Sequence, residues 1–279
     1  MGEGEMNECP ALTTSCTAWK HGTRHVPYRR GALMRIAVAG GTGAIGTLVV
    51  EQLKNAGHEP VVLARSAECD LTNRSAVEQW LVDCQTVIDV SGASTASAAA
   101  SMRYFTQSTA NLVSVGRESG VQNHVALSII GAATVDSGYY AGKAAQERML
   151  QMLPGGYTLL RTTQFHEFIG QNVGRLGAGP VQMAPKMRMQ PIAGSEVAAA
   201  LVALAGGPAQ GVVLDLAGPQ EEYAPDLIAK YLKSRGKSPK IVEVPVPGPM
   251  GKAMRDGRLL PGSSARLGHE TFEAWLARQ

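Results

Sequence analysis

A glycine-rich turn, Gly40-Gly41-Thr42-Gly43-Ala44-Ile45-Gly46, joins an apolar β-branched run to an amphipathic stretch. Glycines at this GxxGxxG spacing are typical of a strand-to-helix turn that binds a dinucleotide diphosphate. Gly40 would permit the tight turn, Gly43 the approach of the phosphates, and Gly46 close packing of the helix on the sheet. The N–H groups at the start of the helix would then face the phosphates. The expected dinucleotide-binding residues are Gly40, Thr42, Gly43, Ala44, Ile45 and Gly46, and the alternative is a plain turn.

The residue that follows the second apolar run indicates which dinucleotide is favoured. In Val62-Leu63-Ala64-Arg65-Ser66, an arginine stands near the position where an NAD-binding chain has an Asp or Glu for the ribose 2′-hydroxyl. A guanidinium group pairs well with a phosphate dianion. Arg65 therefore predicts NADP(H) over NAD(H), and the alternative is a solvated surface arginine.

Two further short segments are expected to line the dinucleotide. Asp70 and Leu71 would flank the adenine ring, and Ser91, Gly92 and Ala93 follow another apolar run directly. The small side chains of this second segment would leave its backbone open to the cofactor.

Five short β-branched runs would position these segments, at residues 36–39, 61–63, 87–90, 125–130 and 158–160. Helical stretches separate them, and in the clearest one Ile45, Leu48, Val49 and Leu53 share a face before Gly57 ends the helix. Strands that are apolar on both faces and alternate with helices require a parallel sheet covered by helices. Residues 34–164 are therefore predicted to form a Rossmann-type, doubly wound α/β domain.

The regular alternation ends near residue 163, and residues 165–279 are expected to form a smaller substrate-binding lobe. A stretch rich in Gly, Met and Pro covers residues 170–194. Helices are expected at 195–205 and from Pro225, strands at 212–216 and 241–244, and a last amphipathic turn near Trp275. Residues 1–33 have acidic residues first, then a basic run without periodicity, so a disordered extension is expected, with Met34 as a candidate natural start.

The glycine turn, Ser128 and Tyr139-Tyr140-Ala141-Gly142-Lys143 together resemble a short-chain dehydrogenase/reductase of the atypical, NmrA-like branch of NAD(P)-binding oxidoreductases. The resemblance covers about residues 34–275 and includes the segments 124–147 and 160–165. It implies that Ser128, Tyr139 and Lys143 are catalytic. Tyr139 would give a proton to a carbonyl oxygen as hydride arrives, Ser128 would hold that oxygen, and Lys143 would bind the nicotinamide ribose.

The spacing of the last two residues agrees with these roles. Positions i and i+4 of a helix share a face, so the Lys143 ammonium group would lie near the Tyr139 phenol and lower its pKa. The separation of 11 residues between Ser128 and Tyr139 is shorter than usual in the family, and either Tyr139 or Tyr140 could face the nicotinamide. The alternatives are tyrosine rings packed against the sheet and a Lys143 that is an exposed partner of Glu147.

Phe165 and His166 are expected to bind substrate, with His166 and Phe168 at the mouth of a cleft; the alternative is that they simply start a helix. No second histidine follows the His166-Glu167 pair at the spacing of a zinc protease. A metal site is therefore not expected.

Composition excludes several classes of protein. Among 279 residues, 44% are hydrophobic and 18% are charged, which favours a large core over disorder. A net charge of +3 without a basic patch argues against nucleic-acid and membrane partners, so a small-molecule substrate is expected. The four cysteines (Cys9, Cys16, Cys69 and Cys84) show neither disulfide nor zinc spacing. A cytoplasmic monomer or homodimer without a membrane span or secretory signal is expected.

Three functions are compatible with these residues. The leading one is an NADPH-dependent oxidoreductase for a small, flat, apolar carbonyl or quinone, with its site outside the carboxyl ends of the strands and under residues 165–194 as a lid. The second is a non-catalytic, NmrA-like NADP(H) sensor that reports redox balance to a protein partner. The third, a nucleotide-sugar epimerase or dehydratase, would need a larger and more polar C-terminal lobe than residues 165–279 offer.

Overall fold

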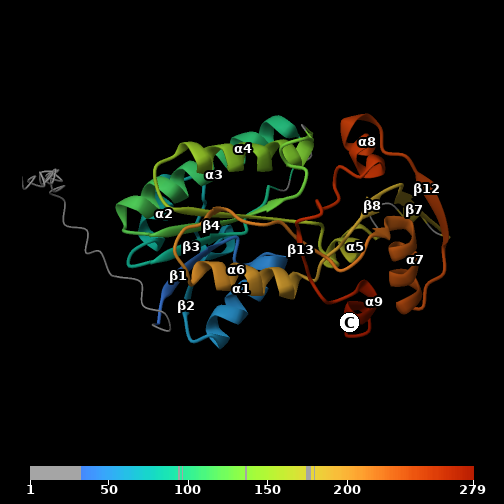
Figure 1. Cartoon of the computed structure of the whole chain (residues 1–279), viewed down its shortest axis with the longest axis horizontal. Helices are drawn as coiled ribbons and strands as arrows, with labels where there is room; N and C mark the ends of the chain where they lie inside the picture. The colour runs from blue at the N-terminus through green and yellow to red at the C-terminus, as the bar shows by residue number, and fades with distance from the viewer. Residues whose placement is uncertain (1–32, 94, 96, 136, 174–176, 179) are drawn as a thin grey trace, which may run out of the picture.

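A parallel β-sheet runs through the centre of the molecule, with helices on both of its faces (Figure 1). The computed structural model describes residues 33–279 except 94, 96, 136, 174–176 and 179. The N-terminal extension expected over residues 1–33 therefore lies outside the described residues except for its last residue, and Cys9 and Cys16 lie outside them too.

Among the described residues, the central sheet has eight strands, all paired in parallel. They are β1 (Arg35–Ala39), β2 (Glu59–Leu63), β3 (Thr86–Asp89), β4 (Asn123–Ile129), β5 (Tyr157–Thr162), β9 (Gly211–Val212), β10 (Leu216–Ala217) and β13 (Arg266–Leu267). Their order is β2-β1-β3-β4-β5-β10-β13, and β9 also pairs with β5. The chain changes direction across the sheet between β1 and β3, and open α/β sheets bind ligands at such a switch point.

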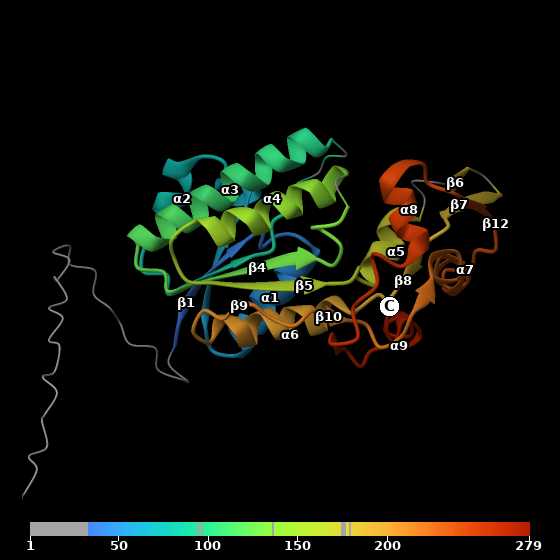
Figure 2. The same ribbon diagram turned by 45° about the horizontal axis from the view of Figure 1, so that its top comes forward.

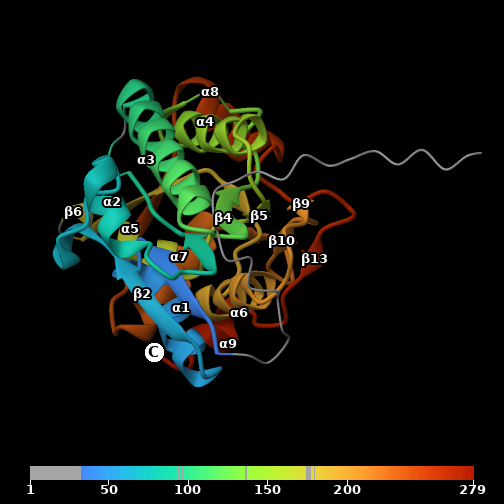
Figure 3. The ribbon, with the colours of Figure 1, turned by 90° about the vertical axis from the view of Figure 1, so that its left-hand side faces the viewer.

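Helices cover both faces of this sheet (Figure 2, Figure 3). One face carries α1 (Ala44–Asn55) and α6 (Gly194–Ala205), and the other carries α2 (Arg74–Trp80), α3 (Ala98–Glu118) and α4 (Gly138–Met152). Alternate residues of a strand point to opposite faces. In β1, Ile36 and Val38 belong to the core beneath α1 and α6, whereas Ala37 and Ala39 belong to the core beneath α2 and α3. The predicted Rossmann-type, doubly wound fold is therefore confirmed.

The remaining elements gather beyond the carboxyl ends of β4 and β5 (Figure 2). They are α5 (Glu167–Asn172), β6 (Gly177–Ala178), β7 (Val181–Pro185), β8 (Arg188–Met189), β11 (Glu222–Tyr223), α7 (Ala224–Ser234), β12 (Lys240–Val244), α8 (Gly248–Asp256) and α9 (Phe272–Leu276). We call these elements the small lobe. Its core contains Met187, Met189, Leu227, Phe272 and Trp275, all of them buried.

Two segments differ from the sequence prediction. The strand expected at 212–216 is two short strands, β9 and β10, because β9 pairs with Thr158 and Leu159 while β10 pairs with Thr162 further along β5. The stretch 170–194, rich in Gly, Met and Pro and without a predicted strand, contains β6, β7 and β8. In β7 the polar residue Gln182 is buried while Met183 is 40% exposed, so the hydrophobic pattern conceals this strand.

The chain returns to the central sheet after residue 164. Val197, Ala198 and Leu201 of α6 pack in the same core as Ile45 and Val49 of α1. The strands β9, β10 and β13 extend the sheet beyond β5. A boundary at residue 164 thus marks where the chain first leaves the sheet, and the division into two domains there stays a prediction. None of the described helices combines the length and the apolar character that a bilayer-spanning segment needs.

Candidate cofactor and active site

The glycine turn is packed tightly between the ends of two neighbouring strands. Gly40 has a φ of 81°, and its N–H donates to the Leu63 carbonyl at the end of β2 over 2.8 Å. A Cβ atom on Gly40 would lie 2.8 Å from the Cα of Ser91, which follows β3. A Cβ on Gly46 would lie 2.1 Å from the Gly40 carbonyl oxygen, so Gly46 packs on the turn itself rather than on the sheet. Both positions therefore require glycine, because a larger residue would collide with neighbouring backbone atoms.

The N-terminus of α1 is open and fits a diphosphate. Gly43 is its N-cap, and no side chain among the described residues caps this end. Thr42, Gly43 and Ala44 are exposed, whereas Ile45 is 6% exposed and belongs to the core, so it offers only its backbone. A Cβ atom on Gly43 would meet only the Gly40 oxygen, at 3.3 Å. Uncapped N–H groups with the positive end of the helix dipole suit phosphate oxygens.

Arg65 begins a short 3-10 helix, η1 (Arg65–Ala67), directly after β2. Its side chain is exposed, and the next residue, Ser66, donates a hydrogen bond from Oγ to the Thr42 hydroxyl over 3.4 Å. The guanidinium group is therefore on a segment that contacts the glycine turn, where a 2′-phosphate would need a cation. Sequence reasoning did not include Ser66 in the site, although its place beside Arg65 was a usable signal.

Asp70 and Leu71 have different surroundings. The Asp70 carboxylate accepts hydrogen bonds from the Thr72 N–H at 2.9 Å and the Thr72 hydroxyl at 2.8 Å. These bonds lower the pKa of Asp70, with a smaller contribution from Arg65. The Leu71 side chain is 5% exposed, and its carbonyl oxygen accepts from Asn111 Nδ2 at 2.9 Å. Leu71 therefore offers little side-chain surface to an adenine ring.

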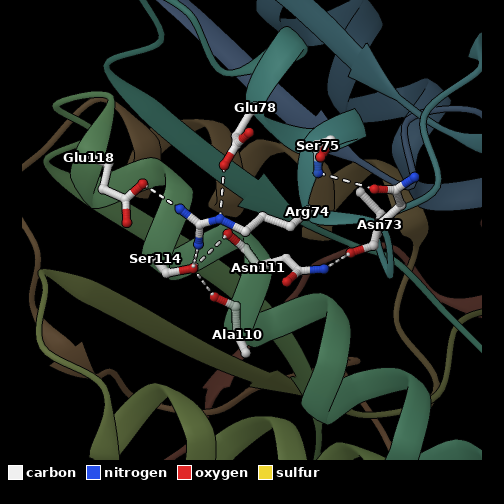
Figure 4. Close-up of polar contacts among 9 residues, drawn as sticks. Asn73, Arg74, Ser75, Glu78, Ala110, Asn111, Ser114 and Glu118 are labelled. Carbon is white, nitrogen blue, oxygen red and sulfur yellow. Dashed lines mark hydrogen bonds and ion pairs between the residues drawn. The ribbon is translucent and has the colours of Figure 1, made fainter.

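Arg74 links α2 to α3 next to this segment (Figure 4). Its guanidinium group donates to the Ser114 hydroxyl at 3.0 Å and forms ion pairs with Glu78, at 2.8 Å, and with Glu118. Asn111 and Ser114 are on the same helix, so α3 holds both the Leu71 backbone and the start of α2.

The segment after β3 connects the glycine turn with α4. Ser91 is 3% exposed, and its N–H donates to Asp89 Oδ1 at 2.9 Å. The Ser91 carbonyl oxygen lies 3.4 Å from Lys143 Nζ. Gly92 is exposed, and a Cβ atom there would lie 3.9 Å from the Tyr139 hydroxyl. Ser91 and Gly92 therefore lie between the turn and the two expected active-site side chains, with the half-buried Ala93 next along the chain.

Tyr139 and Tyr140 point in different directions. The Tyr139 hydroxyl is near Gly92, and its ring packs edge-on against Phe105 with 5.6 Å between centroids. The Tyr140 hydroxyl accepts a hydrogen bond from Gln164 Nε2 at 3.2 Å, and its ring belongs to the small-lobe core. Tyr139 is therefore the tyrosine on the side of the glycine turn. Burial raises the pKa of Tyr139 well above its usual range and raises that of Tyr140 to about 12.

Lys143 is 3% exposed, so it is not an exposed partner of Glu147. Its Nζ donates to the Leu127 carbonyl and to Gln146 Oε1, both at 2.8 Å, and lies 4.4 Å from the centre of the Phe105 ring. Burial lowers the pKa of Lys143 to about 8. Nζ is 5.8 Å from the centre of the Tyr139 ring. The expectation that the Lys143 charge lowers the pKa of Tyr139 is therefore wrong, because burial of the Tyr139 hydroxyl raises that pKa.

Ser128 does not join Tyr139 and Lys143. Its side chain is 2% exposed, and its Oγ donates to Glu147 Oε1 at 2.6 Å. Arg161 on β5 holds the same carboxylate, with Nε 3.0 Å from Oε1 and Nη2 2.7 Å from Oε2. The expected role of Ser128, to hold a substrate oxygen, therefore does not fit this arrangement, since its proton is directed to Glu147.

A buried polar group that sequence reasoning missed lies beneath Lys143. Gln146 accepts from Lys143 and donates from Nε2 to Asp89 Oδ2 at 2.8 Å. Asp89 and Gln146 are both 0% exposed. His124 Nε2 lies 3.9 Å from Asp89 Oδ2, and burial lowers the pKa of His124, which leaves its ring neutral near pH 7. An aspartate within the apolar run 87–90 was the available signal.

The two expected substrate residues lie apart from this group. Phe165 forms a single bridge to Ile192 and packs against the core beneath α1 and α6. His166 is 1% exposed, packs against the rings of Phe272 and Trp275 at 5.5 and 5.7 Å, and its Nε2 lies 3.1 Å from the Glu270 carbonyl. The expectation that His166 lines the mouth of a cleft is therefore wrong; it is the N-cap of α5 inside the small lobe.

Part of the chain is similar to a known protein family. Residues 36–151 match the model of the NAD dependent epimerase/dehydratase family. No curated protein sequence matches the chain.

Several solved structures share the fold over most of the chain. A nucleoside-diphosphate-sugar epimerase from Staphylococcus aureus is similar with 16% identity and a TM-score of 0.68, over 87% of this chain and 99% of that one. An NADPH-dependent quinone oxidoreductase from Escherichia coli, complexed with NADPH, has 17% identity and a TM-score of 0.65, over 87% and 99%. A UDP-glucose 4-epimerase from Thermus thermophilus, in complex with NAD, has 19% identity and a TM-score of 0.62, over 88% and 93%. The chain therefore shares its Rossmann-type fold with these structures, and its residues 36–151 are similar to the NAD dependent epimerase/dehydratase family.

Proposed function

We propose that the protein is an NAD(P)H-dependent oxidoreductase that transfers hydride to a small carbonyl or quinone-like substrate, with NADP(H) as the favoured coenzyme. One observation carries the proposal: the Ser91 backbone contacts both the glycine turn, at Gly40, and the ammonium group of Lys143. A dinucleotide that begins at the turn would thus reach Tyr139 and Lys143. Similar structures from the comparison include enzymes with NAD and NADPH in their names, which supports a nicotinamide coenzyme.

The residues of the chain would divide the work as follows. The backbone of residues 40–46 would hold the diphosphate, and Arg65 with Ser66 would hold a 2′-phosphate. Lys143 would place a positive charge below the ribose. When bound, the reduced nicotinamide would supply the hydride. The Tyr139 hydroxyl, which stays protonated across the neutral range, would donate a hydrogen bond to the acceptor oxygen of the substrate.

A quinone suits this site better than a simple ketone. Hydride addition to a ketone leaves an alkoxide, which needs a proton donor close by. Hydride addition to a quinone leaves a hydroquinone anion, whose weaker basicity lets it take its proton from water. The raised pKa of Tyr139 makes it a weak acid, and Ser128 is held by Glu147. The site therefore favours the substrate that depends least on proton transfer.

The raised pKa of Tyr139 and the hydrogen bond from Ser128 to Glu147 also favour a second candidate, a non-catalytic, NmrA-like NADP(H) sensor. A sensor needs the glycine turn and Arg65 but no proton donor. The two functions differ in turnover and not in coenzyme binding.

The test follows the absorbance of reduced nicotinamide when the purified protein is mixed with NADPH or NADH and a panel of quinones, aldehydes and ketones. We expect oxidation of NADPH that depends on a quinone. Coenzyme binding by calorimetry without turnover would favour the sensor. Interconversion of nucleotide sugars without net oxidation of NADPH would favour an epimerase. The absence of binding to either coenzyme would overturn both proposals.

A further inference from the structure

A chain of hydrogen bonds joins Lys143 to a carboxylate that lies deeper in the protein. Lys143 Nζ donates to Gln146 Oε1 at 2.8 Å, and Gln146 Nε2 donates to Asp89 Oδ2 at 2.8 Å. We propose that Asp89, acting through Gln146, is a positioning residue that fixes the ammonium group of Lys143 and balances its charge. This role rests on the proposed function for its catalytic meaning, but the contacts themselves do not depend on it.

The direction of this chain is set at both ends. An ammonium group only donates hydrogen bonds, and an ionised carboxylate only accepts them. The amide of Gln146 must therefore turn its oxygen to Lys143 and its nitrogen to Asp89, as it does here. If the amide were reversed, its nitrogen would face the Lys143 ammonium group and its oxygen would face the Asp89 carboxylate, so neither hydrogen bond could form. The chain thus holds Lys143 in one orientation.

Charge balance also points to Asp89. Burying a cation without a counter-charge is unfavourable, and Lys143 is 3% exposed. Glu147 is the other nearby carboxylate, but Arg161 and Ser128 already bind it through four hydrogen bonds. His124 is neutral near pH 7 because burial lowers its pKa. The ionisable groups that face Lys143 are Asp89 on β3 and Tyr139 and Glu147 on α4, while His124 on β4 lies near Asp89 and Tyr104 on α3 acts on Tyr139.

The same carboxylate also holds the segment next to the expected coenzyme. Asp89 Oδ1 accepts from the Ser91 N–H at 2.9 Å, while Asp89 Oδ2 accepts from Gln146. Ser91 is packed against Gly40 of the glycine turn. Asp89 therefore holds two groups at once: Lys143, through Gln146, and the Ser91 backbone, which lies between Lys143 and the glycine turn.

The test measures the titration of Lys143 directly, by NMR of protein labelled at the lysine ε-carbon, with Lys143→Met to assign the signal. We expect a midpoint near pH 8 in the native protein. Asp89→Asn removes the charge and replaces an acceptor by a donor facing Gln146, so the midpoint should fall by about one pH unit or more. Glu147→Gln is the matched control, a buried carboxylate on the same helix, and should move the midpoint less.

Gln146→Leu keeps the side chains of Lys143 and Asp89 and removes only the amide group that connects them. It should also lower the midpoint, and it supplies the test if Asp89→Asn does not fold. An unchanged midpoint in the folded Asp89→Asn or Gln146→Leu protein would overturn the proposal, as would a larger shift in Glu147→Gln than in Asp89→Asn.

A second measurement connects the chain to activity. The alkaline limb of the pH profile of kcat/KM reports ionisations of the free enzyme. It should move to lower pH in Asp89→Asn and in Gln146→Leu, in parallel with the NMR midpoint, whereas loss of packing alone would lower activity at every pH. A shifted NMR midpoint in a protein without turnover would count against the proposed function and leave the link between Asp89 and Lys143 supported.

Discussion

Tyr139 and Tyr140 are adjacent in the sequence, yet their hydroxyl groups have different surroundings. The first is near Gly92, beside the glycine turn, and the second is bound by Gln164 at the edge of the small lobe. The two residues therefore provide a matched pair of variants that differ in position but not in chemistry.

Tyr139→Phe should reduce turnover, and Tyr140→Phe should not. Loss of one hydrogen-bond donor to a developing oxyanion costs about 10²- to 10³-fold, so Tyr139→Phe should lower kcat with a ketone or aldehyde by about that range. With a quinone the loss should be smaller, since water can supply the proton. Tyr140→Phe should cost about 1 kcal/mol of unfolding free energy through the lost Gln164 bond. Equal activity of Tyr139→Phe and the native protein with all substrates would remove Tyr139 from the mechanism.

Gly46→Ala should abolish coenzyme binding. The new Cβ would lie 2.1 Å from the Gly40 carbonyl oxygen, and a backbone atom can move away only if the turn changes shape. Overpacking of this kind costs about 1–3 kcal/mol of unfolding free energy. Gly207→Ala is the control, because its Cβ would meet its nearest atom at 3.7 Å. Calorimetry with NADPH and thermal unfolding of both variants check this, and native affinity in Gly46→Ala would contradict it.

Arg65→Ala should weaken NADPH binding while changing NADH binding little. A hydrogen bond to a charged group is worth about 1.5–3 kcal/mol, which corresponds to roughly a tenfold to hundredfold loss of affinity. Arg117→Ala, an exposed arginine at the far end of α3, is the control for a change in overall charge. An equal effect on both coenzymes would place Arg65 outside the 2′-phosphate site.

The buried Lys143 should make stability depend on pH. Its pKa is about 8 in the folded protein and 10.5 for the free side chain, so between these values the unfolded chain binds more protons. The unfolding free energy should therefore rise with pH from about 8 to 10, by up to about 3 kcal/mol. The raised pKa values of the buried Cys69 and Cys84 thiols have the opposite effect above about pH 9, and those of Tyr139 and Tyr140 have it above about pH 10.

Chemical denaturation at a series of pH values measures this dependence. The rise should be lost in Lys143→Met, with Lys54→Met as a control on the exposed surface of α1. The same rise in Lys143→Met and in the native protein would contradict the assignment to Lys143.

Local patterns were sufficient for most of the fold. The five β-branched runs became β1 to β5, and the spacing of Ile45, Val49 and Leu53 predicted α1. The outer strands were harder to predict, since β10 and β13 have two residues each, and β10 pairs with β5 while β13 pairs with β10. No local pattern records such a long-range pairing.

The candidate site was predictable in its motifs but not in its contacts. The spacing of Lys143 and Glu147 left an exposed ion pair open as the alternative to a site role, whereas both side chains are buried and bind different partners. Glu147 is bound by Arg161 from β5 and by Ser128 from β4. Because the Ser128 hydroxyl donates to Glu147, it is not directed to a substrate oxygen as expected. His166 was misjudged for a similar reason, because α9 covers it from more than 100 residues further along the chain.

The packing of α6 on α1 has a consequence for how the protein is made. During synthesis, the helix that would hold the coenzyme leaves the ribosome early, but the part of its apolar side that faces α6 stays uncovered until Val197 and Leu201 arrive. The nucleotide-binding half is therefore finished only after part of the small lobe has been translated, and folding of the two halves must be interleaved in time.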